Sequence, residues 1–359
     1  MENNFKLPIA NYQLQAAILE TLRYFSFFNY GPSAEEIYTF LKKRCSKRAL
    51  DEILQKMAKK SLISISYGGK GKEVSLGKEA GPGLKSRKQN SLPDNYTDFL
   101  SLTKFLYYTD NMPRHTLGEY KRKLQVKSYK LKVTISLSKI EKILPYVKIL
   151  SRFPQIKLVG LSGSAAMLNA KHDHDVDLFI ITEKDRLFTG RFIALIVAEL
   201  MKIRRGRLIT TRVRPHQSGM AKDKVCLNLF FDESDLSIPK RKRSEYVAHE
   251  VLQMKSLIQK DDVYLRFLDA NKWVFDIFPN AKKSNLLFVN SNLGKTKKTS
   301  PHYQLPITHY IGYVIEQVFK RFQLHFINRH RTTELITNTQ LWFHPDDFEK
   351  KFTNKTQSF

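Results

Sequence analysis

The hydrophobic and polar positions divide the chain into helical stretches, alternating stretches and polar connections. Near the N-terminus, apolar residues recur three and four positions apart in three successive stretches, which predicts three amphipathic helices. Ser33 and Ser46 precede the second and third stretches as N-caps, and a glutamate three positions after Ser33 completes a capping box. Alternation from Leu62 to Tyr67, a Gly-rich turn and a return from Glu73 to Leu76 predict a β-hairpin.

This predicted order of three helices and a hairpin is that of a winged helix-turn-helix, which we assign to residues 1–77. A polar, basic stretch rich in Gly and Pro and a helical stretch follow, so we interpret residues 78–153 as a linker and helical connector. Residues 154–238 alternate strand and helix patterns and predict a small mixed β-sheet with flanking helices. Residues 239–359 return to helical patterning and predict a C-terminal helical region, which makes the expected fold class α+β.

Three helices are predicted in the C-terminal region, over Ser244–Gln259, Val263–Phe278 and Ile307–Ile327. The third carries a stripe of large apolar residues at helical spacing, which we interpret as core packing. The stripe consists of Tyr310, Ile311, Val314, Ile315, Val318, Phe319 and Phe322.

Composition narrows the class of protein without identifying it. The chain is 42% hydrophobic and 12% aromatic, which excludes a wholly disordered protein. Its net charge of +27 is compatible with nucleic acid, nucleotide phosphates or an anionic membrane surface and does not choose among them, and a lysine-rich host or an AT-biased genome would produce the same excess. Two cysteines in separate segments build neither a disulfide framework nor a zinc cluster. Since the N-terminus has no signal-peptide pattern and no apolar stretch is long enough to span a bilayer, we expect a cytoplasmic protein without membrane association.

The residues with the clearest chemical meaning lie within residues 157–182. An apolar strand pattern ends at Gly163 and Ser164, a short helical stretch and a polar loop follow, and a second strand pattern begins at Asp175. Side chains alternate along a strand, so Asp175 and Asp177 are predicted to point the same way, roughly 7 Å apart along the backbone. Two carboxylates on one face of a buried strand repel each other and need a cation, for which oxygen ligands favour Mg²⁺ or Mn²⁺.

Gly163 and Ser164 suit the binding of a phosphate group. A glycine at the end of a strand lets the backbone approach a ligand closely, and a helix that begins behind it directs free N–H groups outward. The hydroxyl of Ser164 adds one more donor. A triphosphate held there, with its metal ion bound by Asp175 and Asp177, is placed for attack at the α-phosphorus.

This arrangement resembles the motif of the DNA polymerase beta-like nucleotidyltransferase superfamily, in which Gly-Ser is followed by a spacer and Asp-x-Asp. Ten residues separate Ser164 from Asp175 here. The resemblance implies that Gly163 and Ser164 contact the nucleotide phosphates. It also implies that Asp175 and Asp177 are catalytic metal ligands in the transfer of a nucleoside monophosphate from an NTP to an acceptor, whether protein, RNA or small molecule. The alternative is an accidental Gly-Ser turn beside a charged strand end.

Four further stretches, Ile18–Ile37, Lys224–Glu233, His249–Met254 and His330–Asp346, resemble prokaryotic nucleotidyltransferase-domain proteins with an N-terminal winged helix. Polymerising members of the superfamily usually supply a third carboxylate from a later strand, and the matching pattern here is Val225–Phe231, whose central polar residue is Asn228. An amide can ligate a metal but takes no proton, so Asn228 is expected to contact the nucleotide or metal. Asp232 shares its strand face but lies roughly 13 Å further along. Because this third acid is missing, the alternative is a weak or inactive nucleotide-binding regulator that binds DNA through its winged helix.

Two further groups have both a functional and a simpler interpretation. The loop residues His172, Asp173 and His174 can bind a transition metal or move a proton, or can be solvated loop residues. Basic residues in the predicted DNA-reading helix, in its wing and after the acidic strand can contact phosphates, although Asp51 and Glu52 repel them. These basic residues are Lys42, Lys43, Arg44, Lys47, Arg48, Lys70, Lys72, Lys202, Arg204, Arg205 and Arg207.

Overall fold

The computed structural model describes residues 9–60, 62–67, 104–108, 117–204, 223–282, 306–329 and 331–343. The chain divides into two compact units. Unit 1 comprises Met1–Arg114 and the short segment Phe278–Ala281, and unit 2 comprises His115–Ile277 and Lys282–Phe359.

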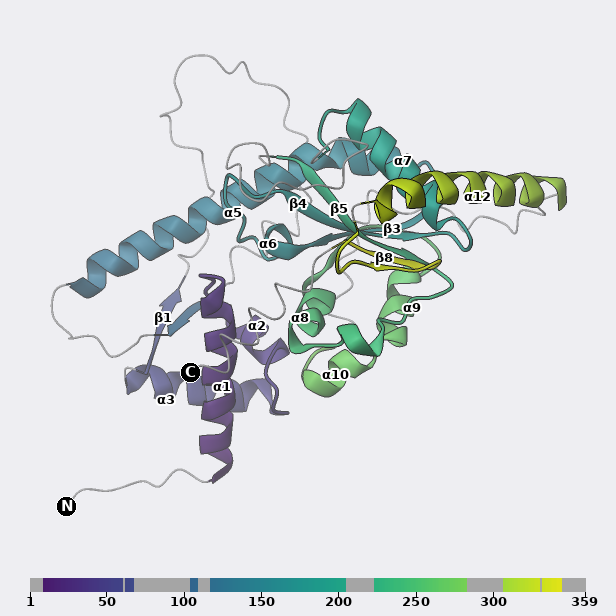
Figure 1. The fold of residues 1–359 in the computed structure, drawn as a ribbon. Coiled ribbons are helices and arrows are strands. Elements are labelled where there is room, and N and C mark those ends of the chain that lie inside the picture. Colours follow the sequence, from purple (N-terminus) through teal and green to yellow (C-terminus); the bar gives the residue numbers. More distant parts are fainter. Residues whose placement is uncertain are drawn as a thin grey trace, which may run out of the picture. The chain divides into compact units, whose positions relative to one another are not determined.

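Helices and a two-stranded antiparallel sheet form the described part of unit 1 (Figure 1). They are α1 (Ile9–Phe27), α2 (Ala34–Thr39), α3 (Lys47–Lys59), β1 (Ile63–Tyr67) and β2 (Lys104–Tyr108). The strand paired with β1 is thus β2, which lies beyond the predicted boundary at residue 77. The return strand predicted at Glu73–Leu76 and the turn before it lie outside the described residues.

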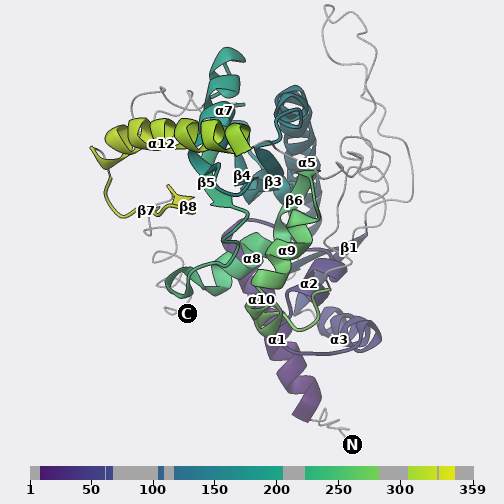
Figure 2. The same cartoon turned by 90° about the vertical axis from the view of Figure 1, so that its right-hand side faces the viewer.

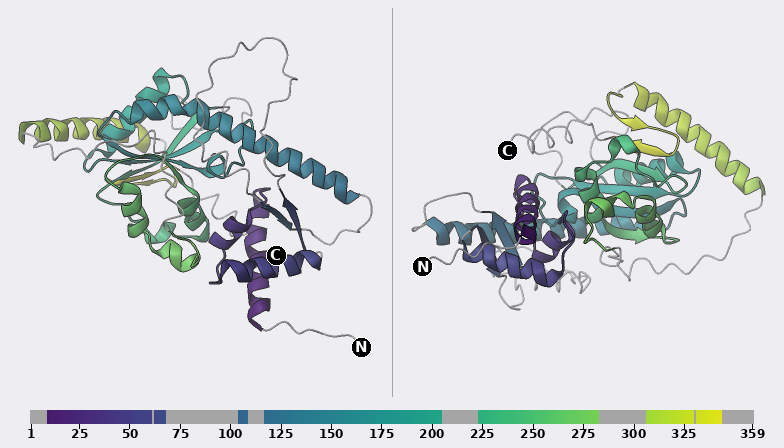
Figure 3. Two further views of the ribbon diagram at one scale, coloured as in Figure 1. Left: turned by 180° about the vertical axis from the view of Figure 1, so that it is seen from behind. Right: turned by 90° about the horizontal axis from the view of Figure 1, so that it is seen from below.

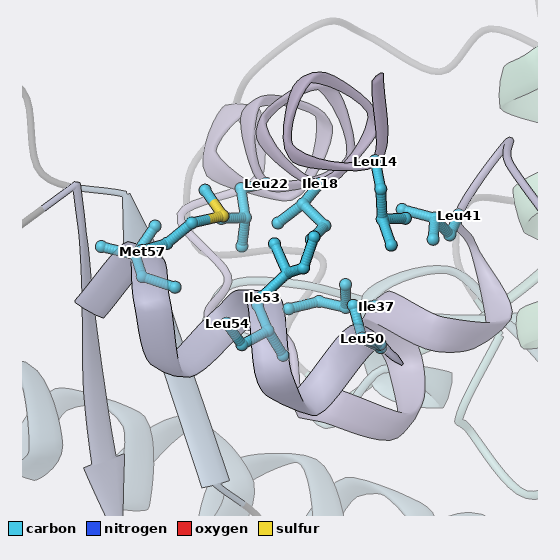
Figure 4. Packing of buried hydrophobic residues seen from close by; sticks show 10 residues of the cluster. Leu14, Ile18, Leu22, Ile37, Leu41, Leu50, Ile53, Leu54 and Met57 are labelled. Atoms are coloured by element: carbon cyan, nitrogen blue, oxygen red, sulfur yellow. The ribbon is translucent and has the colours of Figure 1, made fainter. Parts of the chain in front are cut away.

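The helices of unit 1 begin at the predicted caps and bury the predicted faces. Ser33 Oγ accepts the N–H of Glu36 at 3.2 Å, and Glu36 Oε2 accepts the N–H of Ser33 at 2.7 Å, which confirms the capping box. Ser46 Oγ likewise accepts the N–H of Ala49, in the first turn of α3. Figure 4 shows the apolar side chains of all three helices meeting in one core, which includes Leu14, Ile18, Leu22, Ile37, Leu41, Leu50, Ile53, Leu54 and Met57.

Residues from far along the chain complete unit 1. Asn280 is buried, and its Nδ2 donates to the carbonyl oxygens of Leu41 and Lys43 at 3.3 and 2.8 Å. Its Oδ1 accepts the N–H of Cys45 at 3.1 Å. One distant side chain therefore satisfies the polar backbone groups that lie between α2 and α3.

A mixed six-stranded sheet in the order β6-β3-β4-β5-β8-β7 is the centre of unit 2 (Figure 2). Its central strands are those predicted from the sequence, and β4 and β5 run parallel whereas the other neighbours are antiparallel. The strands are β3 (Ile156–Ser162), β4 (Val176–Thr182), β5 (Val225–Asp232), β6 (Lys255–Gln259), β7 (Leu335–Ile336) and β8 (Gln340–Trp342).

Helices cover both faces of this sheet, as Figures 1 and 3 show. One face carries α5 (Leu117–Leu150), α7 (Leu187–Leu200) and α12 (Pro306–Asn328). The other carries α8 (Glu245–Gln253), α9 (Val263–Ala270) and α10 (Trp273–Ile277), and the single turn α6 (Gly163–Ala166) follows β3. Among the described helices, none combines the length and the apolar character needed to cross a membrane.

The C-terminal region is not the purely helical part that the sequence predicted, because it supplies β6, β7 and β8. The helix predicted over Ser244–Gln259 ends at Gln253, and the following residues form β6 against β3. β3 is buried and its backbone N–H and C=O groups need partners on both sides. This demand of the sheet outweighs the weak helical pattern of a five-residue segment.

α12 presents most of its apolar stripe outward, so the predicted core packing of the stripe is wrong. Tyr310 is 67% exposed and Val318 is 59% exposed, whereas Glu316 is only 6% exposed. Both carboxylate oxygens of Glu316 accept backbone N–H groups, from Phe188 and Thr189 at 2.8 Å each. These groups begin α7, which has no side-chain N-cap of its own. The need to satisfy a buried helix terminus therefore turns the polar face of α12 inward.

Candidate metal centre and nucleotide site

Two carboxylates and a thiol meet at the end of the sheet where β4 and β5 begin. Asp175 immediately precedes β4, and Asp177 on β4 is the register partner of Cys226 on β5. One ligand atom from each of Asp175, Asp177 and Cys226 lies within 4.8 Å of the others. The predicted convergence of the two aspartates is therefore confirmed, and Cys226 joins them.

Cys226 was not predicted from the sequence as a site residue, because two cysteines in separate segments suggested neither a disulfide nor a zinc cluster. A register shift places two residues of β5, Leu227 and Asn228, opposite one residue of β4. Asn228 remains beside the group, since its Nδ2 lies 2.6 Å from Cys226 Sγ. The signal available in the sequence was the alternation that places positions 226 and 228 on one strand face. A nucleotide contact by Asn228 stays a prediction.

Asp232, the other candidate third acid, lies away from this group. It pairs with Thr182 at the far end of β4, and its buried carboxylate accepts the N–H of Ser234 at 2.9 Å. Burial raises the pKa of Asp232, while bonds from Ser234, Asp185 and Arg186 oppose that shift. Asp232 thus stabilises a turn at the opposite end of the sheet.

The Gly-Ser turn lies directly against one of the aspartates. Ser162, the last residue of β3, pairs with Asp177, and Gly163 follows in the left-handed region with φ +62°. A Cβ atom on Gly163 would lie 2.6 Å from Asp177 Oδ2. Both the backbone conformation and the close approach therefore require glycine. Ser164 Oγ forms a hydrogen bond with His174 Nδ1 at 3.1 Å, which links the turn to the loop before Asp175.

A further carboxylate, which sequence reasoning missed, contacts the same turn. Glu250 on α8 accepts hydrogen bonds from the Gly163 amide and from the Tyr246 hydroxyl. Burial raises the pKa of Glu250, and these two bonds oppose the shift. The Gly163 amide, predicted as a phosphate donor, is therefore engaged by Glu250 in this structure. A glutamate whose pKa is raised by burial beside such a turn is a candidate general base or acid.

Replacing Glu250 with glutamine should change how stability depends on pH. Because its pKa is raised in the fold, the stability linked to Glu250 is complete below the ordinary glutamate pKa and is lost as the pH rises through the raised value. Glu250→Gln should therefore be more stable than the parent at neutral pH and equal to it in acid. Urea unfolding in EDTA, with Glu245→Gln on the same helix as the control, measures this. If the unfolding free energies of Glu250→Gln and the parent differ by the same amount at every pH, the prediction is contradicted.

The histidine loop and the basic residues after α7 contribute less to the candidate site than the sequence suggested. His172 and Asp173 are exposed, and burial lowers the pKa of the half-buried His174. In the part of the chain that the structure describes, neither histidine joins a group of metal-ligating side chains. Arg204 pairs with Glu199 at 3.5 Å, and Arg205 and Arg207 lie outside the described residues.

The donor set fits a divalent metal ion. Two carboxylates supply the oxygen ligands that Mg²⁺ and Mn²⁺ prefer, and the thiol adds a softer donor that Mg²⁺ uses poorly.

No protein-family model, curated protein or solved structure matches this chain.

Proposed function

We propose that unit 2 is a polymerase beta-like nucleotidyltransferase that transfers a nucleoside monophosphate from an NTP to an acceptor and releases pyrophosphate. The observation that carries the proposal is the contact between Asp177 and the Gly163 turn, within the group formed with Asp175 and Cys226. A phosphate-binding turn and a pair of carboxylates must be adjacent for this chemistry, because the carboxylates would hold the ion that neutralises the phosphates.

In this proposal each side chain has a separate task. Asp175 and Asp177 hold the metal ion, which when bound neutralises charge on the phosphates. Ser164 and Asn228 contact the nucleotide at the two sides of the group. Glu250 holds the Gly163 turn and is the carboxylate available to take the proton of the acceptor hydroxyl.

The proposal is tested by label transfer. The protein is incubated with each α-labelled NTP, Mg²⁺ or Mn²⁺ and a cell lysate, and products are separated to find the labelled acceptor. We expect one NTP to label a specific acceptor, with more transfer in Mn²⁺ because of the thiol of Cys226. The double variant Asp175→Ala/Asp177→Ala is the control. Equal labelling by the variant and the parent contradicts the proposed chemistry.

A second candidate function is a nucleotide-responsive regulator that binds DNA through a winged helix formed by unit 1. Two observations favour it: a thiol rather than a third carboxylate completes the group, and Glu250 engages the Gly163 amide. The ion pairs made by the basic residues at the start of α3 argue against strong DNA binding. Lys47 pairs with Glu35 at 2.7 Å and Arg48 with Glu52 at 3.1 Å, so their charge is partly neutralised.

The two candidates predict different results for the same protein. A regulator binds an NTP in equilibrium dialysis without transferring label, and its affinity for DNA changes when the nucleotide is added. A nucleotidyltransferase transfers label whether or not DNA is present. Label transfer that depends on Asp177 therefore favours the enzyme over the regulator.

A further inference from the structure

Lys139 on α5 is a buried lysine that contacts the loop before β4, the strand that carries Asp177. Its side chain is 2% exposed, and its ammonium nitrogen has three oxygen partners. These are the carbonyl oxygens of His172 and His174, at 3.1 and 2.6 Å, and Asp223 Oδ1 at 3.1 Å. An ammonium group has three N–H donors, so these three acceptors match its full capacity.

The partners of Lys139 lie just before the strands that carry the metal-binding group. His174 immediately precedes Asp175, and Asp223 lies shortly before Cys226 on β5. The carbonyl of His174 belongs to the same planar peptide unit as the Cα atom of Asp175. The bond from Lys139 to that carbonyl therefore fixes the backbone orientation from which the Asp175 side chain leaves.

α5 also holds the other end of this loop. Ser136, one turn before Lys139, is fully buried, and its Oγ accepts the N–H of Ala170 at 2.9 Å. Just before β5, burial would raise the pKa of Asp223, but bonds from Lys142 and Lys139 outweigh it and hold that pKa below its usual value. The loop before β4 and the residues before β5 are thus tied to one helix.

We propose that Lys139 is a positioning residue for the metal centre, acting through the backbone of residues 172–174 and through Asp223. It sets the position of Asp175 relative to Cys226 through its bonds to the His174 carbonyl and to Asp223. The role in metal binding depends on the proposed function, whereas the role in holding the loop does not. Residues that orient metal ligands in this way typically change metal affinity by about 10- to 100-fold when replaced.

The test compares Lys139→Met with Lys142→Met. Lys142 lies on the same helix and bonds to Asp223 at 2.5 Å, but it is 54% exposed and has no bond to the loop carbonyls among the described contacts. Mn²⁺ titration by calorimetry should show at least about a 10-fold weaker affinity for Lys139→Met. It should show little change for Lys142→Met, and Lys139→Arg should recover part of the affinity because it keeps the charge and the donors.

Amide hydrogen exchange of residues 170–175 in EDTA is the second measurement. Exchange should be faster in Lys139→Met and unchanged in Lys142→Met. Ser136→Ala, which removes the bond to Ala170 and a bond to the Lys132 carbonyl within α5, should also speed exchange and serves if Lys139→Met does not fold. Parent-like affinity and exchange in folded Lys139→Met, or equal losses in Lys142→Met, overturn the proposal. A parent protein that binds no Mn²⁺ contradicts the proposed function instead, and the exchange rates still report whether Lys139 holds the loop.

Discussion

Asp175→Asn and Asp177→Asn are each expected to abolish stabilisation by Mn²⁺ and the transfer of labelled nucleotide. An asparagine keeps the size of the side chain but loses the charge that attracts the metal. Mn²⁺ at 100 times its dissociation constant should raise the unfolding free energy of the parent by about 2.7 kcal/mol. Neither variant should respond to the ion. Thermal unfolding with and without Mn²⁺ measures the difference, and label transfer measures the loss of activity.

Asp173→Asn is the matched control for these variants. Asp173 lies in the same loop as Asp175 and carries the same charge, but it is exposed and outside the group formed by Asp175, Asp177 and Cys226. It should therefore keep the full response to Mn²⁺ and the full rate of transfer. If Asp177→Asn also keeps both, the group formed by Asp175, Asp177 and Cys226 is not a metal site.

Gly163→Ala should destabilise the protein and impair the proposed metal centre together. A non-glycine residue in the left-handed region costs about 1–2 kcal/mol, and the clash with Asp177 Oδ2 at 2.6 Å adds about 1–3 kcal/mol. Relief of the clash must displace the carboxylate of Asp177 or the turn itself. We therefore expect a loss of roughly 3 kcal/mol in urea unfolding. Mn²⁺ affinity in calorimetry should fall by about 10-fold or more, as is typical when a metal ligand is displaced.

Gly160→Ala separates the two effects of the Gly163 substitution. Gly160 lies on β3, three residues before Gly163, and its Cβ would meet the Sδ atom of Met254 at 2.5 Å, at the flexible end of a side chain. This variant should lose stability through overpacking, by about 1–3 kcal/mol, and keep its affinity for Mn²⁺. If Gly163→Ala binds Mn²⁺ as tightly as Gly160→Ala, the turn does not position Asp177.

The features that the sequence predicted well are those governed by neighbours along the chain. Ser33 and Ser46 cap helices because a side-chain oxygen reaches an N–H only three residues away. Asp175 and Asp177 converge because side chains of an extended segment alternate. The apolar periodicity of the first three helices likewise identified the core that joins them.

The features that the sequence did not reveal depend on contacts between distant segments. β6 and β8 form because buried neighbours need backbone partners, a demand that is absent from their own short sequences. The inward polar face of α12 follows from Glu316, which satisfies the beginning of α7. The same apolar periodicity that correctly identified the core in unit 1 was therefore misleading in α12.

By itself the sequence determined the α+β class, the central strands and the aspartate pair, because local geometry fixes which residues share a face. Only the tertiary structure decided that Cys226 joins that pair, that Glu250 engages the Gly163 amide, and that Lys139 holds the loop. These contacts depend on strand register and on helices brought from far along the chain. Neither leaves a periodic signal in the sequence, since the partners are selected by the three-dimensional packing rather than by their neighbours.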